Sequence, residues 1–413
     1  MNRLIQRSFL APELASSALR GWRLRRHLLA LTLFIFGVSG LGFRFWLAKN
    51  SIGCDDANIW LEHARLIDAH GVGFAYAHPD YEQAKFNHPP LMGYLSLLAL
   101  KLSAGDQLRF SWVIKAPGLL VELLSSYLVW RIWSRRGSVV AAAAFAAYAT
   151  CLTSIAVSAF HCNTDCACAG LTLLAFYMFR EKGRAFWSGV ALAAALNVKI
   201  MPVFVIPVLL GQCRSVREAL RFFAGLSLSV VPLVPFLVTV PRSVYSNIFA
   251  YNPIPIEWGI FSFLSAGNEV APLAGHLTTF IGWFVREQRY VILLSVSLLG
   301  VLAFFKPRRF AYDLGAAAWA LFLVLTPGFG VQYTACIVPL LFAADYRRAT
   351  IYGLFAGVMV TAIYTARMSF VLPLRTYVQY YPIPHISSLC GLLTWVLLLA
   401  YLRATWKKLA TVR

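Results

Sequence analysis

The stretch Leu28–Leu47, LLALTLFIFGVSGLGFRFWL, decides the fold class. Its 20 residues match the length that an α-helix needs to cross a hydrocarbon layer of ~30 Å. Later stretches such as Val291–Phe305 are also apolar on every side, whereas a strand of a transmembrane barrel would alternate apolar and polar residues. Leu28–Leu47 therefore predicts a helix that spans a membrane, and we expect it to remain as an anchor because no small-residue cleavage site follows it.

The composition of the 413 residues extends this prediction to the whole chain. Hydrophobic residues make up 59% of the chain and charged residues only 13%. Soluble domains carry about a quarter of charged residues, so one water-soluble core cannot hold this sequence. We expect an all-α, polytopic membrane protein with helical extracytoplasmic loops. We expect about 10–13 transmembrane or re-entrant helices in this protein, given the length that one crossing requires.

The net charge is +20, and the distribution of the basic residues predicts how the chain is oriented in the membrane. Basic residues gather in short clusters between apolar spans, which is the pattern of cytoplasmic loops. A nucleic-acid interface would need a continuous basic face with interleaved aromatic residues, so we expect the lipid bilayer and no nucleic acid as a partner. Both termini are expected in the cytoplasm. The main clusters lie at residues 20–26, 131–136, 180–184, 214–221, 306–309, 347–348 and 403–413.

The same clusters leave two long outer excursions, at about residues 48–109 and 241–289. Within the first, Pro90–Leu102 is short for a crossing and predicts an interfacial or re-entrant helix. We expect residues 1–413 to form a single transmembrane domain whose extracytoplasmic catalytic loop is 48–109.

Two segments, Ala185–Gly211 and Leu314–Ala344, are each too short for two full crossings. Their centres hold polar or helix-breaking residues, at Asn197–Pro202 and Thr326–Tyr333. Irregular backbone at membrane depth is tolerated only inside protein or beside a water-filled cavity. Both segments therefore predict hairpins of short helices whose tips line a site.

Acidic residues follow the first helix at Asp55 and Asp56 and recur in a short outer turn at Asp165. Carboxylates in a loop that excludes water are suited to remove a proton from an acceptor. The alternative is structural: acidic residues are common at the N-termini of helices, where they cap free N–H groups.

Lys199 lies at the tip of the first hairpin among apolar residues. A lysine at that depth needs a carboxylate, backbone carbonyls or an anionic ligand such as a lipid-linked phosphate. The structural alternative is an ion pair with an acid such as Glu122.

Cysteines cluster at Cys162, Cys166 and Cys168, next to His161. The spacing fits no common zinc signature, so we favour simple packing of small residues, with a disulfide or a metal as alternatives. No cofactor is firmly predicted, and a divalent cation stays an open alternative.

Several short motifs together resemble the GT-C-fold integral membrane glycosyltransferases. Similar groups include bacterial mannosyltransferases, aminoarabinose transferases of lipid A and the dolichyl-phosphate-glucose glucosyltransferases. The resemblance extends over most of the chain in order and spacing. Its motifs are Asp55-Asp56-Ala-Asn, Asn87-His88-Pro89-Pro90-Leu91, the helix that starts at Asp165, Asn197-Val-Lys199-Ile-Met-Pro202 and Pro327-Gly-Phe-Gly-Val-Gln332-Tyr333.

The resemblance implies transfer of a hexose or related sugar from a polyprenyl-phosphate donor to an extracytoplasmic lipid, glycan or protein acceptor. It implies direct, inverting displacement with Asp55 as the base, a share of that role for Asp56, and Asp165 orienting acceptor or sugar. Such enzymes belong to the cell envelope, so the resemblance places this chain in a bacterial inner membrane.

The leaving phosphate requires cations, for which Lys199, Lys85 and Arg375 are the candidates. His88 is expected to hydrogen-bond the phosphate or the sugar, unless it is only a turn residue before Pro89. The pocket is expected to include Gln332 and Tyr333, although Tyr333 also fits an interfacial aromatic residue.

A transporter or lipid flippase is the alternative from another functional class, because broken helices and intramembrane charges are typical of transporters. An O-antigen ligase or polymerase is a second enzymatic alternative. The concentration of acids in an outer loop and the absence of visible repeats favour the transferase.

Overall fold

The structure is a computed structural model that describes residues 2–77, 86–250, 258–259, 275–328, 330–367 and 384–411. These residues form helices joined by turns, and no strand occurs among them. The all-α prediction is therefore confirmed over the described part of the chain.

Five of the described helices are long and apolar enough to cross a membrane, and a bent pair makes a sixth if it forms one span. The remaining apolar helices are short, as expected of re-entrant or broken segments. These features bear out the prediction of a polytopic membrane protein. The five are Arg23–Asn50, Gln107–Arg136, Val216–Thr239, Gly282–Phe305 and Leu389–Ala410, and the bent pair is Ser138–Ala149 with Leu152–His161.

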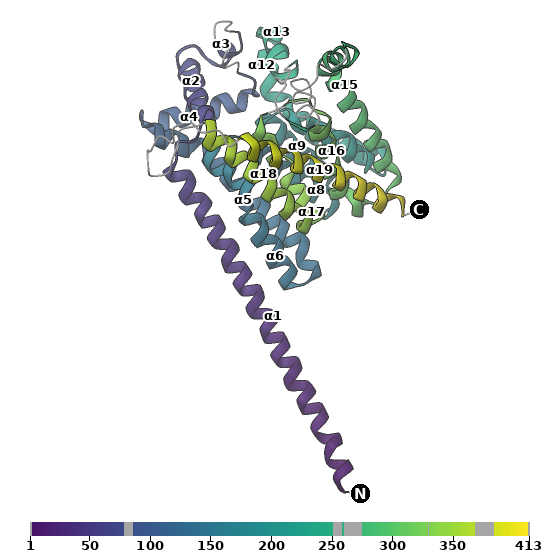
Figure 1. The fold of residues 1–413 in the computed structure, drawn as a ribbon. Helices are drawn as coiled ribbons and strands as arrows, with labels where there is room; N and C mark the ends of the chain where they lie inside the picture. Colours follow the sequence, from purple (N-terminus) through teal and green to yellow (C-terminus); the bar gives the residue numbers. More distant parts are fainter. Residues whose placement is uncertain are drawn as a thin grey trace.

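Helix α1 (Asn2–Asn50) projects from the bundle over its N-terminal part and packs on α6 (Ser138–Ala149) near its other end (Figure 1). Glycines permit the close approach. A Cβ on Gly37 would lie 2.4 Å from the Phe145 ring, and one on Gly40 would also meet α6 and the residue that follows it. Small residues at such contacts let helix backbones come together where lipid supplies no hydrophobic driving force.

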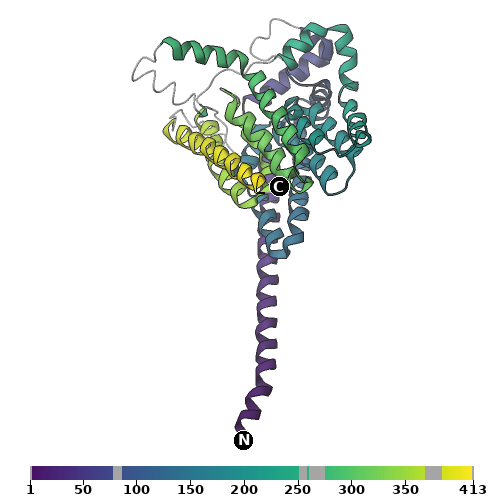
Figure 2. The same ribbon diagram turned by 90° about the vertical axis from the view of Figure 1, so that its right-hand side faces the viewer.

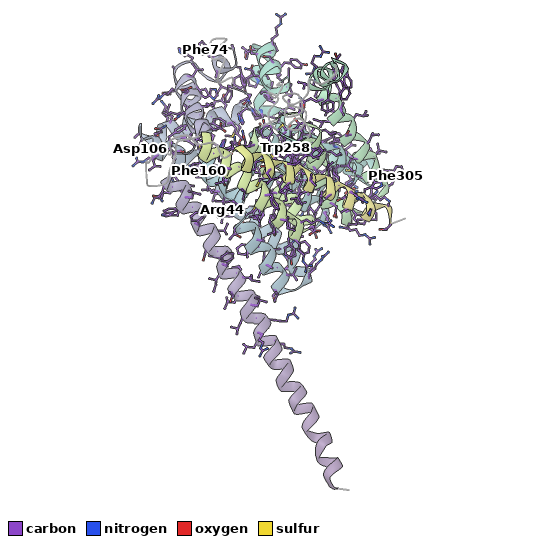
Figure 3. The ribbon with its side chains drawn as sticks, viewed as in Figure 1. Arg44, Phe74, Asp106, Phe160, Trp258 and Phe305 are labelled. Carbon is purple, nitrogen blue, oxygen red and sulfur yellow. The ribbon has the colours of Figure 1, made fainter. Side chains whose placement is uncertain are left out.

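Arg44 stabilises a break between α6 and α7 (Leu152–Ile155), whose axes differ by 41° across the bent pair. The last carbonyls of a helix lack partners within it. The Arg44 guanidinium donates to two of them, those of Tyr148 at 2.6 Å and Ala149 at 2.8 Å. It also forms a buried ion pair of 2.5 Å with Glu122 of α5 (Gln107–Trp133). Figure 3 shows Arg44 where α1 enters the bundle.

After this bend the chain widens into a π-helix at Ala156–His161, and Cys162 then takes a left-handed conformation at φ 68°. Helix α8 (Asp165–Arg180) follows. Single π turns occur often at functional sites because the extra residue redirects the side chains that follow. Here the wide turn ends at His161.

Both segments are broken into short helices at the predicted tips. The first consists of α9 (Ala185–Val198), the 3-10 turn η3 (Met201–Val205) and α10 (Ile206–Gly211), with extended backbone at Lys199. The second consists of α16 (Ala311–Leu325), η8 (Val331–Ala335) and α17 (Val338–Ala344), and α16 packs on α17.

The first outer excursion folds into α2 (Asp55–His70), α3 (Val72–Ala77) and α4 (Pro90–Ser103), which lie together at one end of the bundle (Figure 1). Buried apolar side chains from these helices, including Trp60, form a core of their own. This core holds the start of α2 against the bundle.

Two further segments differ from the sequence prediction in their bounds or continuity. The returning helix expected from Val291 is the end of α15 (Gly275–Phe305), so the second outer excursion is shorter than expected. The preceding span is broken into α11 (Val216–Leu226), two 3-10 turns and α12 (Val234–Thr239), followed by α13 (Pro241–Val244). Figure 2 shows α19 (Pro384–Ala410) beside α18 (Tyr346–Arg367).

The Arg44–Glu122 pair gives a stability prediction. Arg44→Met keeps most of the side-chain volume but leaves Glu122 buried without its cation, and breaking a buried pair in this way costs about 3–5 kcal/mol. We expect a large fall in the thermal unfolding midpoint in detergent. Arg25→Met, at an exposed position of the same helix, is the matched control and should unfold like the wild type. Equal midpoints for the two variants would contradict the assigned role.

Candidate active site

The N-terminus of α2 docks on the outer turn that precedes α8. Asp56 accepts hydrogen bonds on Oδ2 from His161 Nε2 at 2.8 Å and from Asn163 Nδ2 at 2.6 Å. Its side chain keeps 28% exposure. Asp55 is the first residue of α2, and its side chain lies outside the described part.

The pKa of Asp56 follows from these contacts. Burial alone would raise it, but the charge and hydrogen bond of His161 and the amide of Asn163 outweigh burial and lower the pKa of Asp56 to about 2. A depressed carboxyl pKa stabilises the folded state above the ordinary value of 3.8, and that contribution is lost as pH falls through about 2. Asp56 therefore stays ionised at every physiological pH.

His161 is fixed from three sides. Its ring stacks on Tyr364 of α18 with centroids 4.4 Å apart, and its Nδ1 lies 2.8 Å from Cys54 Sγ. Cys54, Asp56 and His161 are the described residues that come closest to a metal site, with ligand atoms within 4.8 Å of one another. The imidazole contacts the other two through its two different nitrogens, so all three reach one cation only after a side chain rearranges. The arrangement fits a hydrogen-bonded chain better than a metal centre.

Asp165 and Lys199 form the second half of the site. Lys199 Nζ donates to Asp165 Oδ1 at 2.7 Å, and the carboxylate is fully buried. The alternative that pairs Lys199 with Glu122 is wrong in its partner, because Glu122 pairs with Arg44. The capping alternative for Asp165 receives no support, because Oδ1 accepts from Lys199 and Cys336 and Oδ2 accepts no hydrogen bond within the described residues.

The two tips, each predicted to line a site, lie together at Lys199. Lys199 Nζ lies 4.3 Å from the ring centroid of Tyr333 in η8, within reach of a cation–π interaction. Tyr333 is buried, which argues against the interfacial alternative. Gln332 is half-buried, and its side chain occupies the space that a Cβ on Gly330 would need.

His88 contacts the end of α9. Its Nδ1 lies 3.1 Å from the carbonyl oxygen of Val198, so this nitrogen carries the proton and donates it. Burial and then the charge of Lys199 lower the pKa of His88 to about 3. A neutral ring with Nδ1 protonated offers only a lone pair at Nε2, which accepts from a hydroxyl but cannot donate to a phosphate. Of the two expected partners, this protonation state favours the sugar.

The structure thus brings together Asp56, Asp165, Lys199, His88 and Tyr333, with Gln332 beside them. Lys85 and Arg375 lie outside the described residues.

All eight cysteines are buried thiols and none forms a disulfide. His161 contacts Cys54 and not Cys162, Cys166 or Cys168, so the structure gives no support to a zinc site of His161 with these three. Packing of small residues is the role that fits them.

Sequence reasoning did not assign His161, Asn163 and Cys54 to the catalytic site. The signal that marks them is the density of polar residues in the short turn 161–165, beside the acid pair at the start of α2.

Comparison with known families finds one similar family. A family described as dolichyl-phosphate-mannose-protein mannosyltransferase matches residues 87–239, more than a third of the chain. The matched residues include His88, Asp165 and Lys199. Over residues 87–239 the chain is similar to this family. This similarity supports a membrane glycosyltransferase of the GT-C class that uses a polyprenyl-phosphate sugar, as the motifs indicated. No curated protein sequence matches the chain.

Lys199 gives the prediction for this site. Lys199→Met keeps much of the volume but removes the cation, and electrostatic interactions are strong where water is excluded. We expect at least a tenfold loss of donor affinity, since charge-assisted hydrogen bonds contribute about 1.5–3 kcal/mol. The donor affinity is measured by the binding of labelled polyprenyl-phosphate mannose to purified protein.

Lys101→Met is the matched control, because Lys101 forms an exposed ion pair with Asp68 on the outer helices. It should bind the donor like the wild type. Wild-type affinity in Lys199→Met would show that Lys199 is structural only.

Proposed function

We propose that the protein transfers mannose from a polyprenyl-phosphate donor to a lipid, glycan or protein acceptor at the extracytoplasmic face of the membrane. One observation carries the proposal: the start of α2, with its acid pair, lies near the buried pair of Lys199, which follows α9, and Asp165, which begins α8. The basic clusters support the orientation, with both termini inside and the site outside.

Lys199 is suited to hold the phosphate of the donor. Negative charge develops on that phosphate as the bond to the sugar breaks, and a fixed cation in a site poor in water stabilises it. Asp165 and Tyr333 hold Nζ from two sides, so little reorganisation is needed. Because Asp165 is fully buried, it acts on a substrate through Lys199 in this arrangement.

We assign the base to Asp55. A base works best when its pKa lies near the working pH, and the low pKa of Asp56 makes that carboxylate a weak one. Asp56 instead keeps the start of α2 on the turn of His161 and Asn163. Asp55 precedes it directly and is positioned by the same contact.

The proposed step is a direct displacement with inversion. The acceptor oxygen attacks the anomeric carbon, the bond from that carbon to the phosphate oxygen breaks, and polyprenyl phosphate leaves. Asp55 takes the acceptor proton, and His88 accepts a hydrogen bond from a sugar hydroxyl at Nε2. Gln332 lines the pocket, and Lys85 and Arg375 add positive charge for the phosphate. Residues 1–413 act as one domain, and 48–109 is its catalytic loop.

The acid pair gives the test of this proposal. Asp55→Asn keeps the shape and the helix start but removes the base, so release of polyprenyl phosphate should fall about 100- to 10,000-fold. Asp56→Asn should lose less, because an amide still accepts one hydrogen bond. The assay uses purified protein in lipid nanodiscs with a donor labelled in the mannose. It measures the release of polyprenyl phosphate and the transfer of label to membrane extract.

Asp68→Asn, on the exposed side of the same helix, controls for changes to α2 and should keep full activity. The assignment of the base would be wrong if Asp55→Asn kept wild-type turnover while Asp56→Asn was inactive. A wild-type protein that moves donor between leaflets without breaking it would support a flippase and contradict the transferase.

A further inference from the structure

A second cavity lies at the other end of α9 from Lys199. It has a volume of about 540 Å³ and is bounded by the residues that begin α9 and α11. With a rise of 1.5 Å per residue, the 14 residues of α9 separate it by about 21 Å from the candidate active site. It is therefore distinct from the donor site. Its lining residues include Arg184, Arg217, Arg221, Trp187, Ser215 and Glu218.

The cavity is strongly positive. Within the described part of the chain, Arg184, Arg217 and Arg221 are exposed and make no ion pair with a carboxylate. The acid in the lining, Glu218, already pairs with Arg308 and accepts the backbone N–H of Arg214. Three guanidinium groups thus face the cavity without a compensating anion.

Backbone packing fixes these arginines near one another. A Cβ on Gly189 of α9 would lie 2.1 Å from the Phe222 carbonyl oxygen, and one on Gly225 of α11 would lie 2.1 Å from the Phe186 carbonyl oxygen. The two helices therefore cross in direct backbone contact. Both N-termini, which carry partial positive charge, open on the same cavity.

Apolar side chains surround the charged mouth. Val216, Leu220 and Trp187 are 76%, 63% and 51% exposed, and Val216 begins one of the apolar spans. Tryptophan and arginine beside an exposed apolar face are typical of the boundary between hydrocarbon and water. These features favour a position for the cavity at the level of lipid phosphates.

We propose that this cavity binds the head group of an anionic phospholipid. The phosphate lies among Arg184, Arg217 and Arg221, and the acyl chains lie along Leu220 and Phe223 of α11. Arginine recognises phosphate through paired N–H donors, and basic pockets between spans are known lipid head-group sites. The lipid clamps α9 to α11, and the site is independent of the transfer reaction.

Native mass spectrometry of the purified protein tests the proposal, with phosphatidylglycerol as the probe and phosphatidylcholine as the neutral comparison. The wild type should bind phosphatidylglycerol at least tenfold more tightly. Each Arg→Gln change should weaken that binding about fivefold, and R184Q/R217Q/R221Q together about 100-fold, from about 1 kcal/mol per basic residue. The single variants keep the test decisive if the triple variant is unstable.

The matched control is R23Q/R403Q/K407Q. It removes the same charge from exposed positions elsewhere in the cytoplasmic basic clusters, and it should bind phosphatidylglycerol like the wild type. Equal binding by the control and the cavity variant would overturn the proposal. So would equal binding of the two lipids, or displacement of phosphatidylglycerol by millimolar inorganic phosphate, which would identify a site for free anions.

Discussion

The buried ion pair between Lys199 and Asp165 is the constraint on which the rest of the site depends. Removing two charges from water is costly, and only close geometry and further contacts repay it. The pair is possible because α9 ends one residue before Lys199 and α8 begins at Asp165. The end of α9 therefore provides the lysine of the pair, and the start of α8 provides the carboxylate.

Further contacts around this pair also depend on breaks in the helices. Arg44 stabilises the bend after α6, the bend leads into the π turn, and the π turn delivers His161 to Asp56. A charge in the first span thus supports the position of the acid pair in the first outer loop. Lys115 adds to this by donating to the Ser51 carbonyl at 2.6 Å, where α1 gives way to α2.

Features that depend on local sequence were predictable. The length of Leu28–Leu47 and the breaks at Asn197–Pro202 and Thr326–Tyr333 indicated a span and two hairpin tips, because apolar length and Pro, Gly and polar residues act locally. Partners were not predictable in the same way. The structural alternative for Lys199 named Glu122 as a possible partner, and nothing in the sequence pointed from His161 to Asp56. In the structure, Asp56 and His161 are 105 residues apart, and only the packing of α1, α5 and α8 brings them together.

In the proposed site, Lys199 holds the phosphate of the lipid-linked sugar while Asp165 holds Lys199. The most direct measurement is the distance between the lysine ¹⁵N and the donor ³¹P by solid-state nuclear magnetic resonance in bilayers, with Lys199→Met used to assign the signal. A charge-assisted hydrogen bond of about 2.7–2.9 Å to a phosphate oxygen predicts an N–P distance of about 4 Å. Bound donor whose phosphorus lies more than about 6 Å from the Lys199 nitrogen, beyond any direct hydrogen bond, would contradict the account.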